Sequence, residues 1–197
     1  MSKTIDFYFD FISPYSYIAY KKVKLMKNKD DFNFNYKPIL LGGLHKLGNI
    51  TAPAFNERKM KNMRNDCEII ATKNNISFKW NDKFPINTLY LMRGFISIDA
   101  NQKNQYFDIC FDAYWKNNID ISVDTNVDQI LDNCKINKKK FFEDIGSQKI
   151  KDELKDLTDK AFQKDVFGAP TFIVNNKLFW GQDRLEYALE ESNFKQF

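Results

Sequence analysis

The segment DFYFDFISPYSY, residues 6–17, alternates aromatic and polar side chains before it reaches a serine and a proline. Phenylalanine stands at positions 7, 9 and 11, and this period of two predicts a half-buried strand. Ser13 and Pro14 follow at once. Serine is a favoured N-cap and proline is favoured at the first helical position, so we predict a helix that begins here and reaches about Met26.

The next segments continue this pattern. Phe32, Phe34 and Tyr36 alternate with asparagine and predict a second strand, which Pro38 limits. Residues 44–160 are predicted to be mostly helical, because apolar side chains recur there at helical spacing. Examples of this spacing are Met60-Met63-Cys67-Ile70, Met92-Phe95-Ile96 and Phe107-Cys110-Phe111-Tyr114-Trp115.

The tail returns to strands. Residues 171–174 and 177–180 are rich in aromatic and β-branched residues and flank Asn175-Asn176, which predicts a hairpin. Asp183 with Glu186 resembles a capping box and predicts a last helix that runs through Leu189.

The order of elements is β-α-β, a helical block, and then β-β-α. This order predicts an α/β protein with a thioredoxin-like fold and a large helical insertion. We expect a discontinuous thioredoxin-like domain made of residues 1–43 and 161–197, with residues 44–160 as an inserted helical domain. The two halves must then pair across the insertion to complete one sheet.

Composition excludes several classes of protein. Among 197 residues there are 30 Lys and Arg and 26 Asp and Glu. These charges are interspersed, which argues against nucleic acid as a partner. No apolar run is long enough to span a membrane, and no signal peptide is recognised, so we expect a cytoplasmic protein. Three scattered cysteines and one histidine exclude the usual zinc spacings and indicate no metal site.

Residues 6–17 resemble the N-terminal motif of the 2-hydroxychromene-2-carboxylate isomerase family. That family is close to kappa-class glutathione transferases and belongs to the DsbA-like branch of thioredoxin folds. The resemblance covers nearly the whole chain and implies glutathione as cofactor, a small aromatic or electrophilic substrate, and a homodimer. Further matching segments follow in order, namely Leu47-Gly48-Asn49, Arg58-Lys59, Pro85-Ile86-Asn87-Thr88-Leu89, Val166-Phe167-Gly168-Ala169-Pro170-Thr171 and Trp180-Gly181-Gln182-Asp183-Arg184.

Ser13 is the catalytic residue that the resemblance implies. Redox thioredoxin folds place Cys-x-x-Cys at this point, whereas this chain has serine at 13 and 16 and cannot exchange a dithiol there. The helix N-terminus still favours an anion. We therefore expect the Ser13 hydroxyl to donate a hydrogen bond to the thiolate of glutathione; the alternative is that Ser13 is only a helix cap.

The resemblance also implies which residues contact the rest of glutathione. It implies that Asn87 and Arg93 contact the aromatic substrate. Alternatives remain for several of them, since Lys59 also suits a solvated helix, Asp183 a cap, and Arg93 a structural role. It further implies that the Ala169-Pro170 peptide bond is cis. The expected glutathione contacts are Asn49, Lys59, Ala169, Pro170, Asp183 and Arg184.

The implied activity is glutathione-dependent cis–trans isomerisation of an intermediate of aromatic degradation. A kappa-type glutathione transferase is the first alternative, because both share every glutathione contact. A non-catalytic fold that binds glutathione or a peptide is the second. His45 and the three cysteines are interpreted as residues without a direct role.

Overall fold

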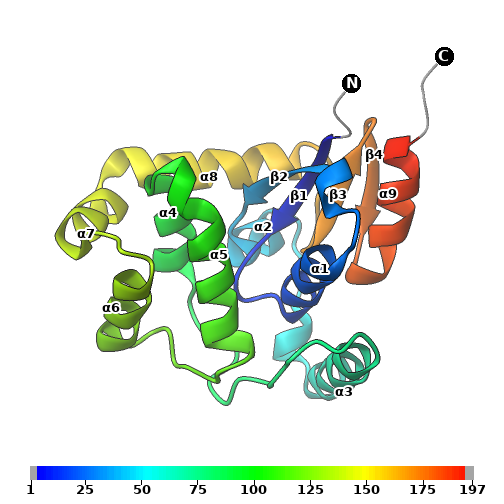
Figure 1. Cartoon of the computed structure of the whole chain (residues 1–197), viewed down its shortest axis with the longest axis horizontal. Coiled ribbons are helices and arrows are strands. Elements are labelled where there is room, and N and C mark those ends of the chain that lie inside the picture. Colours follow the sequence, from blue (N-terminus) through cyan, green and yellow to red (C-terminus); the bar gives the residue numbers. More distant parts are fainter. Residues whose placement is uncertain (1–3, 194–197) are drawn as a thin grey trace.

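Four strands form one mixed sheet in the computed structural model, which describes residues 4–193. They lie in the order β2-β1-β3-β4 (Figure 1). β1 runs parallel to β2 and antiparallel to β3, with Phe7 opposite Phe172. The two ends of the chain therefore meet in one sheet, as predicted. The strands are β1 (Thr4–Phe9), β2 (Asn33–Pro38), β3 (Thr171–Val174) and β4 (Lys177–Trp180).

Helices make up most of the segment between β2 and β3, which confirms the helical block. None of those within residues 4–193 is both long and apolar enough to cross a membrane. The α-helices are α1 (Pro14–Leu25), α2 (Leu41–Leu47), α3 (Glu57–Lys73), α4 (Leu89–Ser97), α5 (Ala100–Trp115), α6 (Asp124–Asn133), α7 (Lys138–Gly146), α8 (Gln148–Phe162) and α9 (Leu185–Asn193). Short 3-10 turns are η1 (Lys29–Asp31), η2 (Pro53–Phe55) and η3 (Gln182–Arg184).

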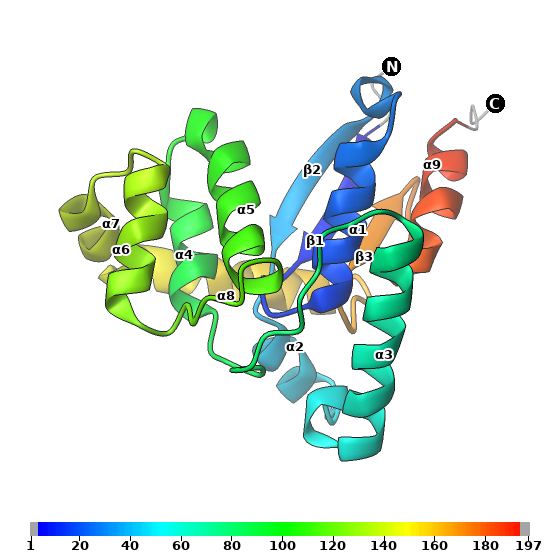
Figure 2. The same cartoon turned by 60° about the horizontal axis from the view of Figure 1, so that its bottom comes forward.

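Helices pack on both faces of the sheet (Figure 2). On one face, α1, α5 and α9 pack around Phe7 and Phe9. On the other, α2 and α8 contribute to a second apolar cluster that contains Tyr8. Successive side chains of a strand point to opposite faces, so one strand supplies both clusters.

This coverage corrects the expectation that the polar face of the first strand is exposed. Tyr8 is 5% exposed and Asp10 only 1%. The alternation of residues 5–11 predicts a strand with one buried face, but α2 and α8 cover the second face as well. The strand is also shorter than its pattern, because it ends at Phe9. Asp10 and Phe11 belong to the loop before α1.

Two helices join the helical block to the sheet. α2 spans positions 43 and 44, and α8 spans positions 160 and 161, so each crosses one of the expected domain boundaries. α8 packs against both β2 and α2. The main apolar cluster contains residues of β1 and of α5, so the packing is continuous from the sheet into the helices.

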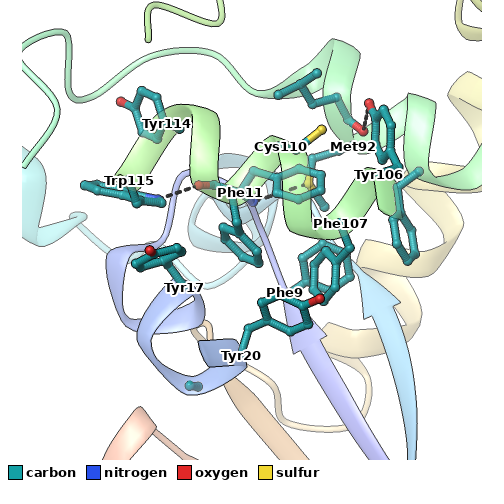
Figure 3. Close-up of a cluster of buried hydrophobic side chains, with 14 of the residues drawn as sticks. Phe9, Phe11, Tyr17, Tyr20, Met92, Tyr106, Phe107, Cys110, Tyr114 and Trp115 are labelled. Atoms are coloured by element: carbon teal, nitrogen blue, oxygen red, sulfur yellow. Dashed lines mark hydrogen bonds between the residues drawn. The ribbon is translucent and has the colours of Figure 1, made fainter. Parts of the chain in front are cut away.

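Aromatic rings fill the contact between the sheet and α5 (Figure 3). The rings of Phe9 and Phe107 lie 4.4 Å apart, and those of Phe11 and Phe111 lie 4.9 Å apart. Each such pair contributes about 0.5–1.5 kcal/mol beyond the burial of its area. The Phe11 carbonyl also accepts a hydrogen bond from the Trp115 Nε1–H at 2.9 Å. The loop between β1 and α1 is therefore fixed from the helical side.

The tail forms the predicted hairpin. Asn175 and Asn176 have φ of 49° and 62°, the left-handed conformation that a two-residue type I′ turn requires. The predicted capping box is wrong. Asp183 lies inside η3, and its carboxylate pairs with Arg184 instead of capping any described residue of α9, which begins at Leu185.

Candidate functional site

Ser13 lies at the N-terminus of α1 and connects it to the loop before β3. Its Oγ accepts a hydrogen bond from the Ser16 N–H at 3.1 Å, which confirms the predicted N-cap. The same hydroxyl donates a hydrogen bond to the Ala169 carbonyl oxygen at 2.8 Å. The side chain is buried, so both hydrogen bonds are shielded from water.

The first turn of α1 also contains polar groups that have no partner among residues 4–193. Pro14 carries no N–H, and the Tyr15 N–H donates no hydrogen bond. The Ser16 Oγ is buried and unpartnered. A helix N-terminus carries about half a positive charge. The free N–H, the hydroxyl of Ser13 and this partial charge together favour an anion.

The Ala169-Pro170 peptide bond is cis, as the resemblance implies. The Ala169 carbonyl accepts the hydrogen bond of Ser13, while its N–H has no partner in the described chain. The Thr171 hydroxyl donates to the Gly168 carbonyl at 2.7 Å and orders the loop on the far side of the proline. One backbone donor next to Ser13 is thus free to bind an extended peptide.

Asp10 is a buried carboxylate that the sequence reasoning did not identify. Its Oδ1 accepts hydrogen bonds from the Ile12 N–H at 3.1 Å and from the Thr88 hydroxyl at 2.6 Å. Its Oδ2 accepts from the Leu41 N–H at 2.8 Å. Burial raises the pKa of Asp10, and these hydrogen bonds oppose that shift. The carboxylate therefore joins the loop of Ser13 to the first residues of α2 and α4.

Asp183 and Arg184 lie beside α1. Their side chains pair at 3.2 Å and are 58% and 51% exposed, so both are accessible to a ligand. The Lys22 ammonium of α1 donates to the Gln182 Oε1 at 2.6 Å and holds η3 against that helix. Burial raises the pKa of Tyr15, and the Asp183 charge adds to this shift. η3, which contains Asp183, therefore packs against α1, and the role of Asp183 toward a ligand stays a prediction.

Asn49 lies between α2 and α3, and Lys59 lies within α3, a helix that packs against α1. The Tyr15 hydroxyl donates to the Asp66 Oδ2 at 2.8 Å and joins α1 to α3. Both Asn49 and Lys59 are exposed, and neither side chain has a hydrogen-bond or ion-pair partner among residues 4–193. Their polar groups are therefore available to a ligand.

The structure separates the two residues expected to contact the aromatic substrate. Asn87 is exposed and directly precedes Thr88, the residue bonded to Asp10, so it lies near the loop of Ser13. Arg93 lies more than one turn further along α4. It lines a cavity formed with α6, α7 and α8, and its Nε is buried without a partner. The role of Asn87 stays a prediction, whereas Arg93 faces a different space.

The cysteines lie in the core. Cys67, Cys110 and Cys134 are all free and buried, which confirms their interpretation as small core residues. Burial raises the pKa of each thiol, that of Cys134 to about 11. A thiol with a raised pKa is protonated and unreactive near neutral pH. Burial likewise lowers the pKa of His45 on α2.

Comparisons with known proteins agree with this fold over nearly the whole chain. The family model for DSBA-like thioredoxin domains matches residues 4–191. A 2-hydroxychromene-2-carboxylate isomerase from Sphingobium xenophagum is 27% identical over 95% of this chain and 96% of its own. Glutathione S-transferase kappa 1 from Homo sapiens is 21% identical over 94% of this chain and 89% of its own.

A solved structure supports the same conclusion about the fold. A 2-hydroxychromene-2-carboxylate isomerase superposes with a TM-score of 0.85 at 24% identity, covering 96% of this chain and 93% of that one. The predicted thioredoxin-like fold with a large helical insertion is thereby confirmed, and so is the resemblance on which the expected site residues were chosen.

Proposed function

The chain belongs to the family of DSBA-like thioredoxin domains, and from this premise we propose that it is a glutathione-dependent cis–trans isomerase of the 2-hydroxychromene-2-carboxylate isomerase type. Its relatives named above are enzymes, an isomerase and a glutathione transferase. The observation that carries the proposal is Ser13, a hydroxyl at the N-terminus of α1 in a chain without a reactive thiol. The proposed substrate is a small unsaturated aromatic carboxylate from aromatic degradation.

The groups around Ser13 suit the central part of glutathione. The Ser13 hydroxyl and the Tyr15 N–H are the two donors available to a sulfur anion. The unpartnered Ser16 Oγ adds a third polar group in the same turn. The free N–H of Ala169, beside Pro170, is available to the extended peptide backbone.

The ends of glutathione require opposite charges. The exposed Asp183 carboxylate suits the ammonium group of the γ-glutamyl end, with Arg184 beside it for the carboxylate. In and before α3, Lys59 and Asn49 offer an exposed cation and an exposed amide to the glycyl carboxylate. These exposed side chains support the proposal because they are available to a ligand. Lys59 and Asn49 have no side-chain partner among the described residues, and Asp183 and Arg184 form an ion pair with each other at the surface.

The first turn of α1 is proposed to favour the ionised form of a bound thiol. Lowering a pKa by two units requires about 2.7 kcal/mol. A hydrogen bond to a charged group contributes about 1.5–3 kcal/mol, and a helix N-terminus adds about 0.3–1 kcal/mol. The Ser13 hydroxyl and the helix together supply about 1.8–4 kcal/mol, a range that includes the required free energy, whereas the helix alone does not reach it. The hydrogen bond to the Ala169 carbonyl that Ser13 gives up lowers this sum.

When bound, glutathione supplies the thiolate nucleophile that adds to the unsaturated substrate and later leaves, so that a former double bond can rotate. Ser13 stabilises the negative charge, and the loop at Ala169 orients the peptide. Asn87, which directly precedes the Asp10-bonded Thr88, is the proposed contact for the substrate near the loop of Ser13. Positioning two reactants in this way replaces a bimolecular encounter with an intramolecular step.

The test follows the equilibration of 2-hydroxychromene-2-carboxylate with its open-chain benzalpyruvate by absorbance. We expect the rate to increase with protein only when glutathione is present, and S-methylglutathione, which has no free thiol, to inhibit it. An unchanged rate with protein and glutathione together would contradict the proposal.

A kappa-type glutathione transferase is the second candidate, favoured by the similarity to the human kappa transferase. It uses the same glutathione contacts and differs only in the electrophile. Conjugation of a chloronitrobenzene without any effect on the chromene would favour it. The homodimer that the resemblance implies stays a prediction.

A further inference from the structure

A second cavity lies apart from Ser13, in the helical block. It has a volume of about 320 Å³ and lies between α4, α6, α7 and α8. The figures show α4, α6 and α7 on the side of the molecule away from α9, with α8 running from α7 toward the sheet (Figures 1 and 2). Residues that line the cavity include Tyr90, Arg93, Asp124, Phe142, Ile145 and Lys151.

The cavity and the Ser13 loop lie on two different faces of α4. Met92 of α4 faces the Ser13 loop, because its sulfur accepts the Phe11 N–H at 3.5 Å. Thr88, the residue just before α4, bonds Asp10 in the same loop. Each helical residue is rotated by about 100° from the one before it. Arg93 therefore points away from that loop and toward α7 and α8.

The charged groups of the cavity lack partners. The Arg93 Nε is buried and makes no hydrogen bond. Arg93, Lys151 and Asp124 form no ion pair with any residue in the range 4–193. Two cations and one acid leave a net positive charge. An anion bound here would pair with a guanidinium and an ammonium that form no ion pair with any described residue.

The remaining walls are apolar. Phe142 and Ile145 come from α7, and Tyr90, 52% exposed, stands at the rim. A planar guanidinium matches a carboxylate through two parallel hydrogen bonds. The volume is near the lower end for small-molecule sites, which range from about 300 to 1,000 Å³. A carboxylate on a small flat ring would use both the cation and the walls, whereas inorganic phosphate would use the cations alone.

We propose that this cavity is a binding site for a small aromatic monocarboxylate, held through Arg93 and Lys151 and separate from the site at Ser13. The proposal goes beyond the proposed function and does not depend on it. It reassigns Arg93 from the substrate of the Ser13 site to a second ligand.

The experiment titrates the full chain with benzoate, without glutathione, and measures the dissociation constant by ligand-observed NMR. We expect saturable binding at millimolar concentrations. Arg93→Gln weakens it about tenfold or more, because a charged hydrogen bond is lost. Lys151→Gln weakens it by a smaller factor. Lys149→Gln, which removes an exposed charge from the same turn of α8, leaves it unchanged.

Further arms separate the two sites. Ser13→Ala and saturating glutathione should leave benzoate binding unchanged, so failure of the proposed function would not alter this result. Circular dichroism verifies that each variant is folded, and Lys151→Gln provides the test if Arg93→Gln does not fold. The proposal is overturned if benzoate does not bind, if glutathione displaces it, if inorganic phosphate binds as tightly, or if Lys149→Gln weakens binding as much as Lys151→Gln.

Discussion

The Ser13 hydroxyl donates a hydrogen bond to the Ala169 carbonyl oxygen at 2.8 Å, although the two residues are 156 positions apart. One side-chain oxygen thus caps α1 and also holds the loop before β3. Under the proposed function, a ligand thiolate must accept the hydrogen bond that this carbonyl now accepts from Ser13. Binding of the thiolate therefore replaces one hydrogen bond of Ser13 with another.

Ser13→Ala is expected to lower the free energy of unfolding by about 1–3 kcal/mol, because α1 loses its cap and the Ala169 carbonyl loses a donor. It should also reduce the glutathione-dependent isomerisation rate about a hundredfold, the usual effect of removing one donor to a developing anion. Urea denaturation and the absorbance assay measure the two effects.

The control is Ser16→Ala, which removes a buried hydroxyl that has no partner. Because a buried hydroxyl without a partner costs free energy, its removal should not lower the free energy of unfolding. Equal destabilisation by the two substitutions would show that the cap and the Ala169 contact contribute nothing specific.

Asp10→Asn is expected to destabilise the fold by about 2 kcal/mol or more. The carboxylate accepts three hydrogen bonds on two oxygens, whereas an amide has one acceptor oxygen and turns an N–H2 group toward a donor. Asp30→Asn, at an exposed position of η1, should change stability by less than about 0.5 kcal/mol. A small effect at Asp10 would contradict its role in joining the loop to α2 and α4.

The pH dependence of stability offers an independent test of Asp10. Its pKa is raised in the folded protein, mainly by burial, above the ordinary aspartate value of 3.8. The folded state therefore binds the proton more tightly than the unfolded state. The contribution of Asp10 is fully present below pH 3.8 and is lost as pH rises through the raised pKa. Relative to Asp10→Asn, the wild type should gain stability on acidification through this interval; the opposite slope would refute the raised pKa.

Local signals predicted the elements well. A serine-proline pair marked the start of α1, and an Asn-Asn pair marked the hairpin, because caps and turns depend on a few adjacent residues. Asp10 was missed for the opposite reason. Its burial results from α2, α4 and α8, which are distant in sequence, and an aspartate in an alternating strand is indistinguishable from a solvated one.

The candidate site shows the same limit. The resemblance selected Ser13, Ala169 and Asp183, and the fold brings all three to α1. It also selected Arg93, whose direction depends on the rotation of α4 against its neighbours. A shift of one residue along α4 would turn the Arg93 side chain from the second cavity toward the Ser13 loop. Helix boundaries cannot be predicted from sequence to that precision.

Asp183→Asn is expected to raise the KM for glutathione about tenfold, which corresponds to about 1.4 kcal/mol, with little change in stability. The carboxylate is 58% exposed and pairs only with Arg184, so it contributes little to the folded state. Glu186→Gln removes a nearby exposed charge and should leave KM unchanged. If both variants raise KM equally, the increase results from the loss of negative charge in this region and not from a lost contact with the γ-glutamyl end.

Gly94→Ala should be among the more destabilising single-methyl additions in this protein. A Cβ at Gly94 would collide with the Phe141 ring and the Tyr106 hydroxyl, both buried, so neither can move without disturbing the core. Overpacking of this kind costs about 1–3 kcal/mol. Gly42→Ala in α2 meets no atom within 4 Å and should instead gain up to about 1 kcal/mol from helix propensity. Urea denaturation of both variants measures the difference. Equal stabilities would mean that α4 can shift away from α5 and α7. Thr88, just before α4, and Arg93 within it would then be held less firmly than the packing indicates.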